Sequence, residues 1–437
     1  MSDTENLPSN EMLADIDKAG MDLVLRVENL VTNFYTYEGT VLALDRVNLF
    51  LRRGDTMGVV GETGCGKSVT AKSILRLVEL PGRIEEGKIL LNEKDRKTGE
   101  INTIDILDLT EKEMLEVRGR RIAIVFQDPA TFPNPVFRVG TQISEVIKLH
   151  QDLSEEALEM RIEDLASQIR ILDIKESDRV RRRQVELKRK GREYDENEQE
   201  KDKKAEEKYI EKKERLSRKM EYLNRMKDDP PEPPKQYRDA VAMRRAIQML
   251  EMVKMPAADR IAMQYPHELS GGMRQRALIA MALSCNPSIL ICDEATTALD
   301  VTVQAQVLNL LNELKSEIGS SIMIITHDLG VVAETCNWVN VMYAGTTVES
   351  ASTKDLFERP MHPYTGGLLQ AIPKLHEDKE RLDQILGTVP NLINPPSGCR
   401  FHPRCDFATD ICKTDRPDLR ELRPMHFVAC HHPQGDY

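Results

Sequence analysis

A glycine-rich stretch near the start of the chain limits the possible folds more than any other feature. Residues 61–68 read GETGCGKS, which matches GxxxxGK followed by Ser or Thr. The apolar run TMGVV precedes this stretch, and a helical pattern runs from Ser68 to about Leu80. A strand, a glycine-rich loop and a helix in this order form the setting of a phosphate-binding loop. The stretch therefore predicts an α/β domain that binds a nucleotide.

The residue types of this loop suit phosphate chemistry. Glycines let successive backbone amides point at the phosphates, Lys67 reaches the β and γ oxygens, and the Ser68 hydroxyl ligates Mg²⁺. A chance glycine-rich turn is the alternative, and the flanking strand and helix argue against it. The predicted contacts to ATP in this loop are Gly61, Glu62, Thr63, Gly64, Cys65, Gly66, Lys67, Ser68 and Val69.

A second segment, SILICDEATTALD, predicts the hydrolytic half of the site. Four apolar residues, Ile289 to Cys292, form a buried strand that ends on Asp293, which is expected to hold Mg²⁺ through water. Glu294 follows and is placed to act as the general base for the attacking water. A carboxylate pair in a solvated turn is the alternative. The phosphate loop in the same chain favours the catalytic interpretation.

A third segment, ELSGGMRQR, indicates that two copies of such a domain work together. Ser270, Gly271 and Gly272 lie where a helix begins, so their amides and the helix dipole form an anion-binding nest. Since residues 61–68 already hold this chain's own nucleotide, a second phosphate clamp suggests a nucleotide held by another subunit.

Together, the phosphate loop, LSGG and DEATTALD resemble the ATP-binding cassette family. The resemblance implies a P-loop NTPase cassette, with a RecA-like core, an antiparallel β subdomain and a helical subdomain. It also implies roles outside the three segments: Tyr35 stacks on adenine, with Tyr37 or Phe34 as alternatives, Gln127 touches Mg²⁺ and the nucleophilic water, and His327 holds the γ-phosphate. Asp300 corresponds to the family's dimer-interface loop. Ala295 replaces a proline common in importers; alanine also occurs there in the family, so the change does not imply inactivity.

Further segments, among them HPYTGGLLQAIP and GCRFHPRC, resemble the ATPase subunits of dipeptide, oligopeptide and nickel importers. The resemblance implies a second cassette, two transmembrane permeases, an external substrate-binding protein and a place at the cytoplasmic face of the membrane. An ATPase of DNA repair or chromosome maintenance is the alternative, because such proteins also interrupt the cassette with a coiled coil. A ribosome-associated cassette is a second alternative, although those proteins usually carry two cassettes in one chain.

Composition fits a large protein without targeting signals. The chain has 437 residues, a formal net charge of −11, an N-terminus without the pattern of a signal peptide and no apolar run long enough to span a membrane. The acidic balance predicts no nucleic-acid partner. The expected division is a polar tail (1–22), a first core part (23–134), a helical subdomain (135–268), a second core part (269–350) and a C-terminal extension (351–437).

The helical subdomain is interrupted by a strongly charged insert, residues 176–236. Within it Tyr209, Leu216 and Leu223 recur every seven residues, so we expect a solvated helical hairpin that turns near residues 195–197 and stops at PPEPPK. The family resemblance does not account for this insert. An exposed hairpin without a partner and one that contacts a permease or regulator both fit the sequence.

Four cysteines cluster in the last tenth of the chain: Cys399, Cys405, Cys412 and Cys430. Their spacing contains no CxxC pair, so it differs from most zinc sites and from the ferredoxin patterns. Disulfides are not expected in a reducing cytosol. The spacing leaves a shared metal or ordinary buried thiols as alternatives. The resemblance to peptide-importer ATPases implies a 4Fe-4S cluster in preference to zinc.

Overall fold

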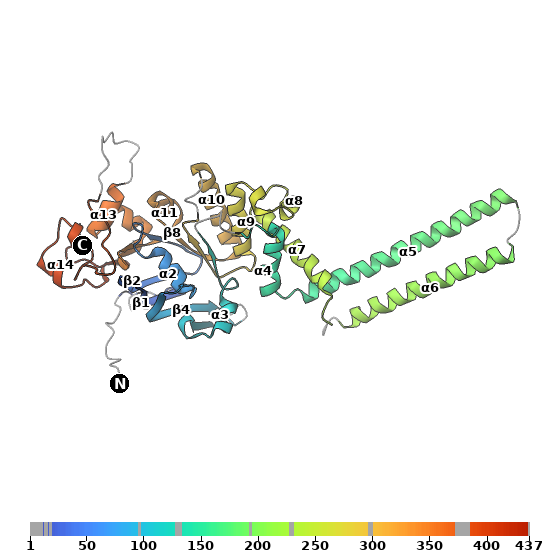
Figure 1. Cartoon of the computed structure of the whole chain (residues 1–437), viewed down its shortest axis with the longest axis horizontal. Helices are drawn as coiled ribbons and strands as arrows, with labels where there is room; N and C mark the ends of the chain where they lie inside the picture. Colours follow the sequence, from blue (N-terminus) through green and yellow to red (C-terminus); the bar gives the residue numbers. More distant parts are fainter. Residues whose placement is uncertain are drawn as a thin grey trace. The chain divides into compact units, whose positions relative to one another are not determined.

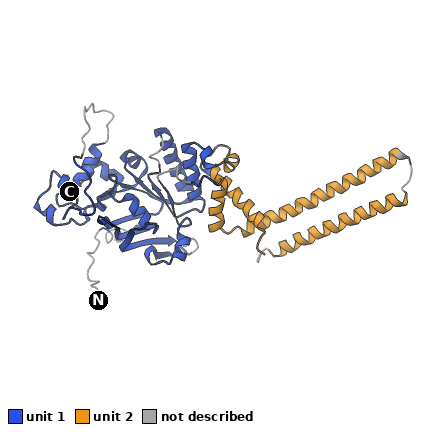
Figure 2. Cartoon of the chain, in the orientation of Figure 1, with its two compact units in different colours: residues 1–136, 252–255, 265–437 blue, residues 137–251, 256–264 orange. Residues whose placement is uncertain are grey.

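The computed structural model describes Met12, Ile16 and residues 20–94, 98–126, 133–191, 195–226, 231–295, 300–371 and 385–435. The chain divides into two compact units, which Figure 2 distinguishes by colour. Unit 1 comprises residues 1–136, 252–255 and 265–437, and unit 2 comprises residues 137–251 and 256–264. Within the described ranges, no helix is both long enough and apolar enough to cross a membrane.

Unit 1 is built on an eight-stranded sheet in the order β11-β12-β10-β9-β3-β8-β7-β6. The central strands β9, β3, β8, β7 and β6 run parallel. Every residue of β3, β7 and β8 is buried, which explains why these segments read as continuous apolar runs. The bounds are β3 (Thr56–Val60), β6 (Ile122–Val125), β7 (Ile289–Asp293), β8 (Ser321–Thr326), β9 (Trp338–Tyr343), β10 (Thr346–Ser352), β11 (Arg420–Arg423) and β12 (His426–Val428).

A second, antiparallel sheet of unit 1 has the order β2-β1-β4-β5. Its strands are β1 (Leu23–Thr36), β2 (Gly39–Arg52), β4 (Gly82–Lys94) and β5 (Ile101–Asp105). Side chains of both sheets and of helix α2 (Lys67–Ile74) belong to one hydrophobic core, with Leu25, Val59, Ile74 and Ile291 among its fully buried members. The shared core fixes α2, the helix that follows the phosphate loop, between the sheets.

The remaining helices of unit 1 connect these strands (Figure 1). They are α3 (Glu111–Val117), α9 (Gly271–Leu283), α10 (Val301–Ile318), α11 (Leu329–Thr335), α12 (Thr353–Glu358), α13 (Pro363–Gln370) and α14 (Asp410–Thr414), with 3₁₀ turns η1 (Ile106–Asp108), η2 (Pro266–Glu268) and η3 (His402–Arg404).

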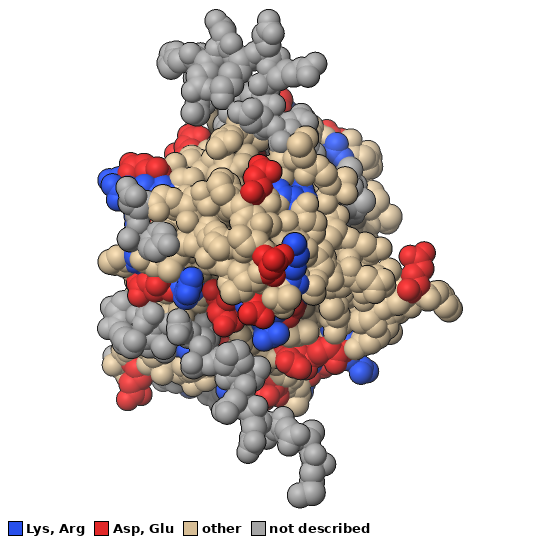
Figure 3. Space-filling model, turned by 90° about the vertical axis from the view of Figure 1, so that its left-hand side faces the viewer, with Lys and Arg blue, Asp and Glu red and all other residues tan. Residues whose placement is uncertain are grey.

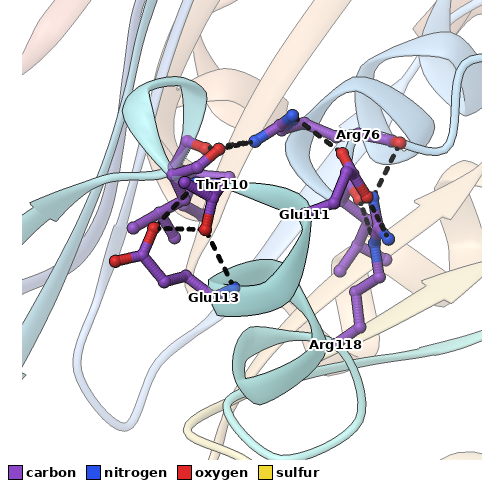
Figure 4. Close-up of polar contacts among 8 residues, drawn as sticks. Arg76, Thr110, Glu111, Glu113 and Arg118 are labelled. Atoms are coloured by element: carbon purple, nitrogen blue, oxygen red, sulfur yellow. Dashed lines mark hydrogen bonds and ion pairs between the residues drawn. The ribbon is translucent and has the colours of Figure 1, made fainter.

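Helix α3 anchors the end of α2, as Figure 4 shows. Thr110 and Glu113 form a capping box that starts α3. Glu111 then accepts from Arg76 at 2.8 Å and from Arg118 at 3.1 Å, while Arg118 Nη2 donates to the Arg76 carbonyl at 3.0 Å. Because Arg76 directly follows the last turn of α2, this network holds the helix that carries Lys67 and Ser68.

The C-terminal region continues the central sheet. β12 pairs antiparallel with β10, and β11 pairs with β12. A buried hydrogen bond supports the junction: His426 Nε2 lies 2.7 Å from Glu349 Oε1, and Glu349 also accepts from the backbone amides of Met361 and His362. On the face shown in Figure 3, basic and acidic side chains are interspersed.

Unit 2 is helical. Its helices are α4 (Val139–His150), α5 (Ser154–Lys190), α6 (Glu196–Arg225), most of α7 (Lys235–Met252) and α8 (Ala258–Ala262). α5 and α6 form the expected hairpin, but α5 begins at Ser154, well before residue 176. Its first half is amphipathic and continues without a break into the charged segment.

The two halves of the hairpin are held differently. In one half Leu158 and Leu165 of α5 pack against Leu216 and Leu223 of α6, which confirms two of the three residues of the predicted stripe. The third, Tyr209, instead donates from its hydroxyl to Asp173 at 2.7 Å. Near the turn, Asp202 of α6 pairs with Arg179 at 3.0 Å and with Arg183 at 3.2 Å. The hairpin is therefore held by apolar packing in the half remote from its turn and by ion pairs closer to the turn.

Candidate functional site

Neighbouring backbone packs so closely against the loop between β3 and α2 that two of its glycines have no room for a side chain. Gly61 has a φ of 151°, and a Cβ there would lie 2.2 Å from the Met342 carbonyl oxygen. Gly66 has a φ of 100°, and its Cβ would lie 2.9 Å from the Ala43 carbonyl oxygen. Only glycine tolerates both the conformation and the close approach. The sequence pattern thus maintains the tight loop that phosphate binding requires.

Lys67 occupies the interior of this loop. Its side chain is buried, and Nζ donates to the carbonyl oxygens of Gly61 at 2.7 Å and Glu62 at 3.0 Å. These two bonds hold the ammonium group among the loop's peptides, where a fixed positive charge attracts phosphate oxygens.

Ser68 and Asp293 meet although they are far apart in the sequence. The Ser68 hydroxyl donates to Asp293 Oδ1 at 2.9 Å, so the first turn of α2 meets the end of β7. Burial raises the pKa of the Asp293 carboxyl, and the bond from Ser68 opposes that shift. A hydroxyl and a carboxylate are hard oxygen donors of the type that Mg²⁺ takes. The pair therefore fits the predicted Mg²⁺ site.

Glu294 lies beside His327 at the ends of two neighbouring parallel strands. Glu294 has a φ of 47°, an uncommon conformation for a residue other than glycine, and its amide donates to the Ile325 carbonyl at 2.9 Å. His327 Nδ1 lies 3.5 Å from Glu294 Oε1. The carboxylate is mostly buried, whereas the imidazole is largely exposed. This geometry suits a base next to a group that contacts a phosphate.

The LSGG segment starts α9 as expected. Ser270 is the N-cap residue and accepts from the Met273 amide at 3.4 Å, and its side chain is exposed. Gly272 faces α10, where an added Cβ would lie 2.8 Å from Val303 Cγ1, whereas Gly271 has open space around it. Asp300 caps α10 by accepting from the Val303 amide at 3.0 Å. An exposed helix start with small residues leaves its amides accessible to an anion.

The predicted adenine contact lies at the end of β1. Tyr35 is half-exposed, and its hydroxyl donates to Glu85 at 2.8 Å, a bond that raises the pKa of the phenol. Tyr37 is fully exposed, whereas the Phe34 ring lies against Gly82. The rings of Tyr35 and Tyr37 thus remain accessible for stacking on an adenine, whereas Phe34 contributes to packing. Gln127 lies outside the described residues.

The predicted iron-sulfur cluster is wrong. None of the eight cysteines, all of which lie in the described ranges, forms a disulfide. Cys399, Cys405, Cys412 and Cys430 line one space of about 10 Å³, which is no larger than a single water needs. Burial raises the pKa of Cys399 and Cys405, and that of Cys430 to about 12. Among the residues described, no group of three or more His, Cys, Asp or Glu side chains is arranged to hold a metal ion. The described part of the C-terminal extension therefore supports neither the predicted iron-sulfur cluster nor zinc in its place.

Two contacts to the phosphate loop are not predicted by the sequence. The hydroxyl of Tyr364, on α13, accepts from the Glu62 amide at 2.9 Å, and Arg404 forms an ion pair with the Glu62 carboxylate. Both residues lie in segments that resemble importer ATPases, but the resemblance assigns them no contact with the loop, and each lies some 300 positions or more beyond it.

Comparison with known proteins agrees with this geometry. The family described as "ABC transporter" matches residues 44–187 and 175–297, and the family "Oligopeptide/dipeptide transporter, C-terminal region" matches residues 348–412. Both descriptions concern transporters and give no support to the DNA-repair alternative.

Similar proteins include the probable peptide ABC transporter ATP-binding protein y4tR of Sinorhizobium fredii, 39% identical over 411 residues, which cover 94% of this chain and 95% of the relative. The oligopeptide transport ATP-binding protein OppD of Escherichia coli is 38% identical over 412 residues, with 94% of each chain covered. Among solved structures, a dimeric bacterial ABC transporter cassette aligns at 21% identity with a TM-score of 0.47, covering 75% of this chain and 98% of that chain. Since the curated relatives match over almost their whole length, this chain belongs to the ABC transporter family, as an ATP-hydrolysing cassette subunit with the C-terminal region of oligopeptide and dipeptide transporters.

Proposed function

We propose that this ATPase powers the import of dipeptides and oligopeptides through a membrane ABC transporter. The observation that carries the proposal is the combination of two features in one chain. The Ser68–Asp293 contact joins the phosphate loop to the hydrolytic strand, and residues 348–412 match the C-terminal region of oligopeptide and dipeptide transporters. Relatives named for peptide transport align over 94% of the chain.

In this proposal, the residues of the site divide the work of hydrolysis. The loop amides and Lys67 bind the β and γ phosphates, and Ser68 and Asp293 hold Mg²⁺, which neutralises phosphate charge when bound. Glu294 takes a proton from the attacking water, while His327 and Gln127 orient that water and the γ-phosphate. Tyr35 stacks on the adenine.

A second cassette completes the site in this scheme. Ser270, Gly271 and Gly272 of each subunit bind the γ-phosphate held by the other, and Asp300 lies at the subunit interface. ATP thus closes the pair, and hydrolysis reopens it. The cassettes act at the cytoplasmic face of the membrane on two permeases that receive peptide from an external binding protein.

The test is to purify the intact complex from its native membrane and identify its subunits by mass. The proposal expects permease subunits, with ATP hydrolysis that rises when peptide-loaded binding protein is added. A complex without permeases, or hydrolysis that peptides leave unchanged, would contradict it.

A further inference from the structure

A residue of the C-terminal region, Arg404, forms an ion pair with Glu62 of the phosphate loop. Arg404, in η3, donates from Nη1 to Glu62 Oε2 at 2.7 Å and from Nη2 to Glu62 Oε1 at 3.1 Å. Two parallel charge-assisted bonds of this kind fix both the position and the plane of a carboxylate. The Arg404 side chain is only 5% exposed and that of Glu62 is 30% exposed, so the pair is partly shielded from solvent.

The rest of the guanidinium group is also fully engaged. Its Nε donates to the Leu386 carbonyl at 2.9 Å, and Nη2 also reaches the Ile385 and Gly387 carbonyls, both at 3.3 Å. The central guanidinium carbon, Cζ, lies 5.7 Å from the centroid of the Tyr343 ring. Arg404 is therefore a fixed charge, unlike a surface arginine that moves freely through solvent.

The backbone of Glu62 is held as well. Its amide donates to the buried hydroxyl of Tyr364, whose ring packs against Tyr343 at 4.7 Å and Phe401 at 5.3 Å. Tyr364 and Phe401 belong to the C-terminal region, and Tyr343 ends β9. The aromatic group thus connects the central sheet, α13 and the cysteine-containing segment to one residue of the phosphate loop.

Glu62 in turn touches the catalytic lysine. Its carbonyl oxygen accepts from Lys67 Nζ at 3.0 Å, so a shift of Glu62 would move one of the two acceptors that hold the ammonium group. Its carboxylate is a negative charge in the loop that must receive a triphosphate, which would repel the ligand if left unpaired. Arg404 neutralises this charge and fixes it in place.

We propose that Arg404 is a positioning residue for ATP binding, which holds Glu62 and through it the Lys67 acceptors, so that the C-terminal region sets the nucleotide affinity of the cassette. The inference rests on the use of ATP at this loop. It gives the family's C-terminal region a task in the nucleotide cycle that does not depend on a metal.

The test compares full-length variants for binding of a fluorescent ATP analogue and for ATP hydrolysis. Arg404→Gln should raise the Kd for the analogue about tenfold, equal to about 1.4 kcal/mol, and raise the KM for ATP in parallel. The kcat should change less than about threefold, because the contact is the same in the ground and transition states. Arg404→Lys keeps the charge without the fork and should fall between wild type and Arg404→Gln.

Arg416→Gln is the matched control. Arg416 also belongs to the C-terminal region, but it pairs with Asp45 of β2 at 2.7 Å and not with a carboxylate of the phosphate loop. This variant should leave the Kd within about twofold of wild type, because its partner does not touch the nucleotide residues. Equal Kd values for Arg404→Gln and Arg416→Gln would overturn the inference.

A double-mutant cycle separates positioning from loss of structure. In a Glu62→Gln background, Arg404→Gln should change the Kd by less than about twofold, since its partner charge is already gone. A full tenfold effect in that background would mean that Arg404 acts only through folding, and would overturn the inference. A wild-type chain that binds no ATP would instead contradict the nucleotide site itself.

Discussion

Replacement of Glu294 by Gln tests the proposed base with little structural disturbance. Gln has nearly the same volume, so the contact with His327, which lies 3.5 Å from Glu294, should be kept. Neither the strained backbone of Glu294 nor the hydrogen bond from its amide to the Ile325 carbonyl involves the side chain. ATP binding should therefore stay within about twofold of wild type, because the phosphate loop is untouched.

Turnover should fall much further. A general base contributes about 10²- to 10⁴-fold in rate, which corresponds to about 3 to 5 kcal/mol of barrier. The assay is phosphate release at saturating ATP and Mg²⁺, with a binding isotherm measured on the same preparation. Glu313→Gln, which removes an exposed carboxylate paired with Lys254, is the control and should keep wild-type turnover. Wild-type turnover by Glu294→Gln would refute the assignment of the base.

Three other properties follow from described contacts. Ser68→Ala removes the hydroxyl that donates to Asp293, so the Mg²⁺ concentration for half-maximal phosphate release should rise at least about tenfold; an unchanged titration would argue against this Mg²⁺ site. Leu216→Ala opens a cavity in the hairpin and should lower its stability by about 2 to 5 kcal/mol, so limited proteolysis of α6 should accelerate. Arg218→Gln, which breaks only an exposed pair on α6, should not have this effect. Burial lowers the pKa of His362 from 6.5 to about 4. The free energy of unfolding should therefore be highest above pH 6.5 and fall as the pH drops towards 4, because the unfolded chain binds a proton that the folded chain does not. The loss should be about 3 kcal/mol, at about 1.4 kcal/mol per pKa unit. The measurement is urea unfolding at several pH values, and His362→Asn, which cannot ionise, should lose less stability over that range.

Short motifs with a chemical reason for their spacing predict that residues far apart in the sequence meet beside the phosphate loop. Ser68 and Asp293 are 225 positions apart, yet each is defined by its own strand and loop, and they meet at 2.9 Å. Buried apolar runs likewise predict β7 and β8, because a strand covered on both faces has no polar side. The heptad spacing of Leu216 and Leu223 predicts the hairpin face in the same way.

Features that depend on distant, unpatterned contacts could not be predicted. Arg404 and Glu62 are 342 positions apart, and although each lies in a recognisable segment, nothing in the sequence indicates that the two pair. The spacing of Cys399, Cys405, Cys412 and Cys430 says nothing about the room between their sulfur atoms, so the resemblance alone suggested a cluster that the packing does not accommodate. The start of α5 was missed because charge composition marks the insert but not the helix that carries it.

The most direct test of the account is ATP-driven peptide uptake by vesicles that contain the purified complex. With wild-type subunit, ATP and Mg²⁺, a labelled oligopeptide should accumulate in the direction of import, and the rate should follow phosphate release. With Glu294→Gln, ATP should bind and accumulation should stop. Equal accumulation by both proteins, or phosphate release by the wild-type complex without any peptide accumulation, would contradict the central claim that this chain couples ATP hydrolysis to peptide import.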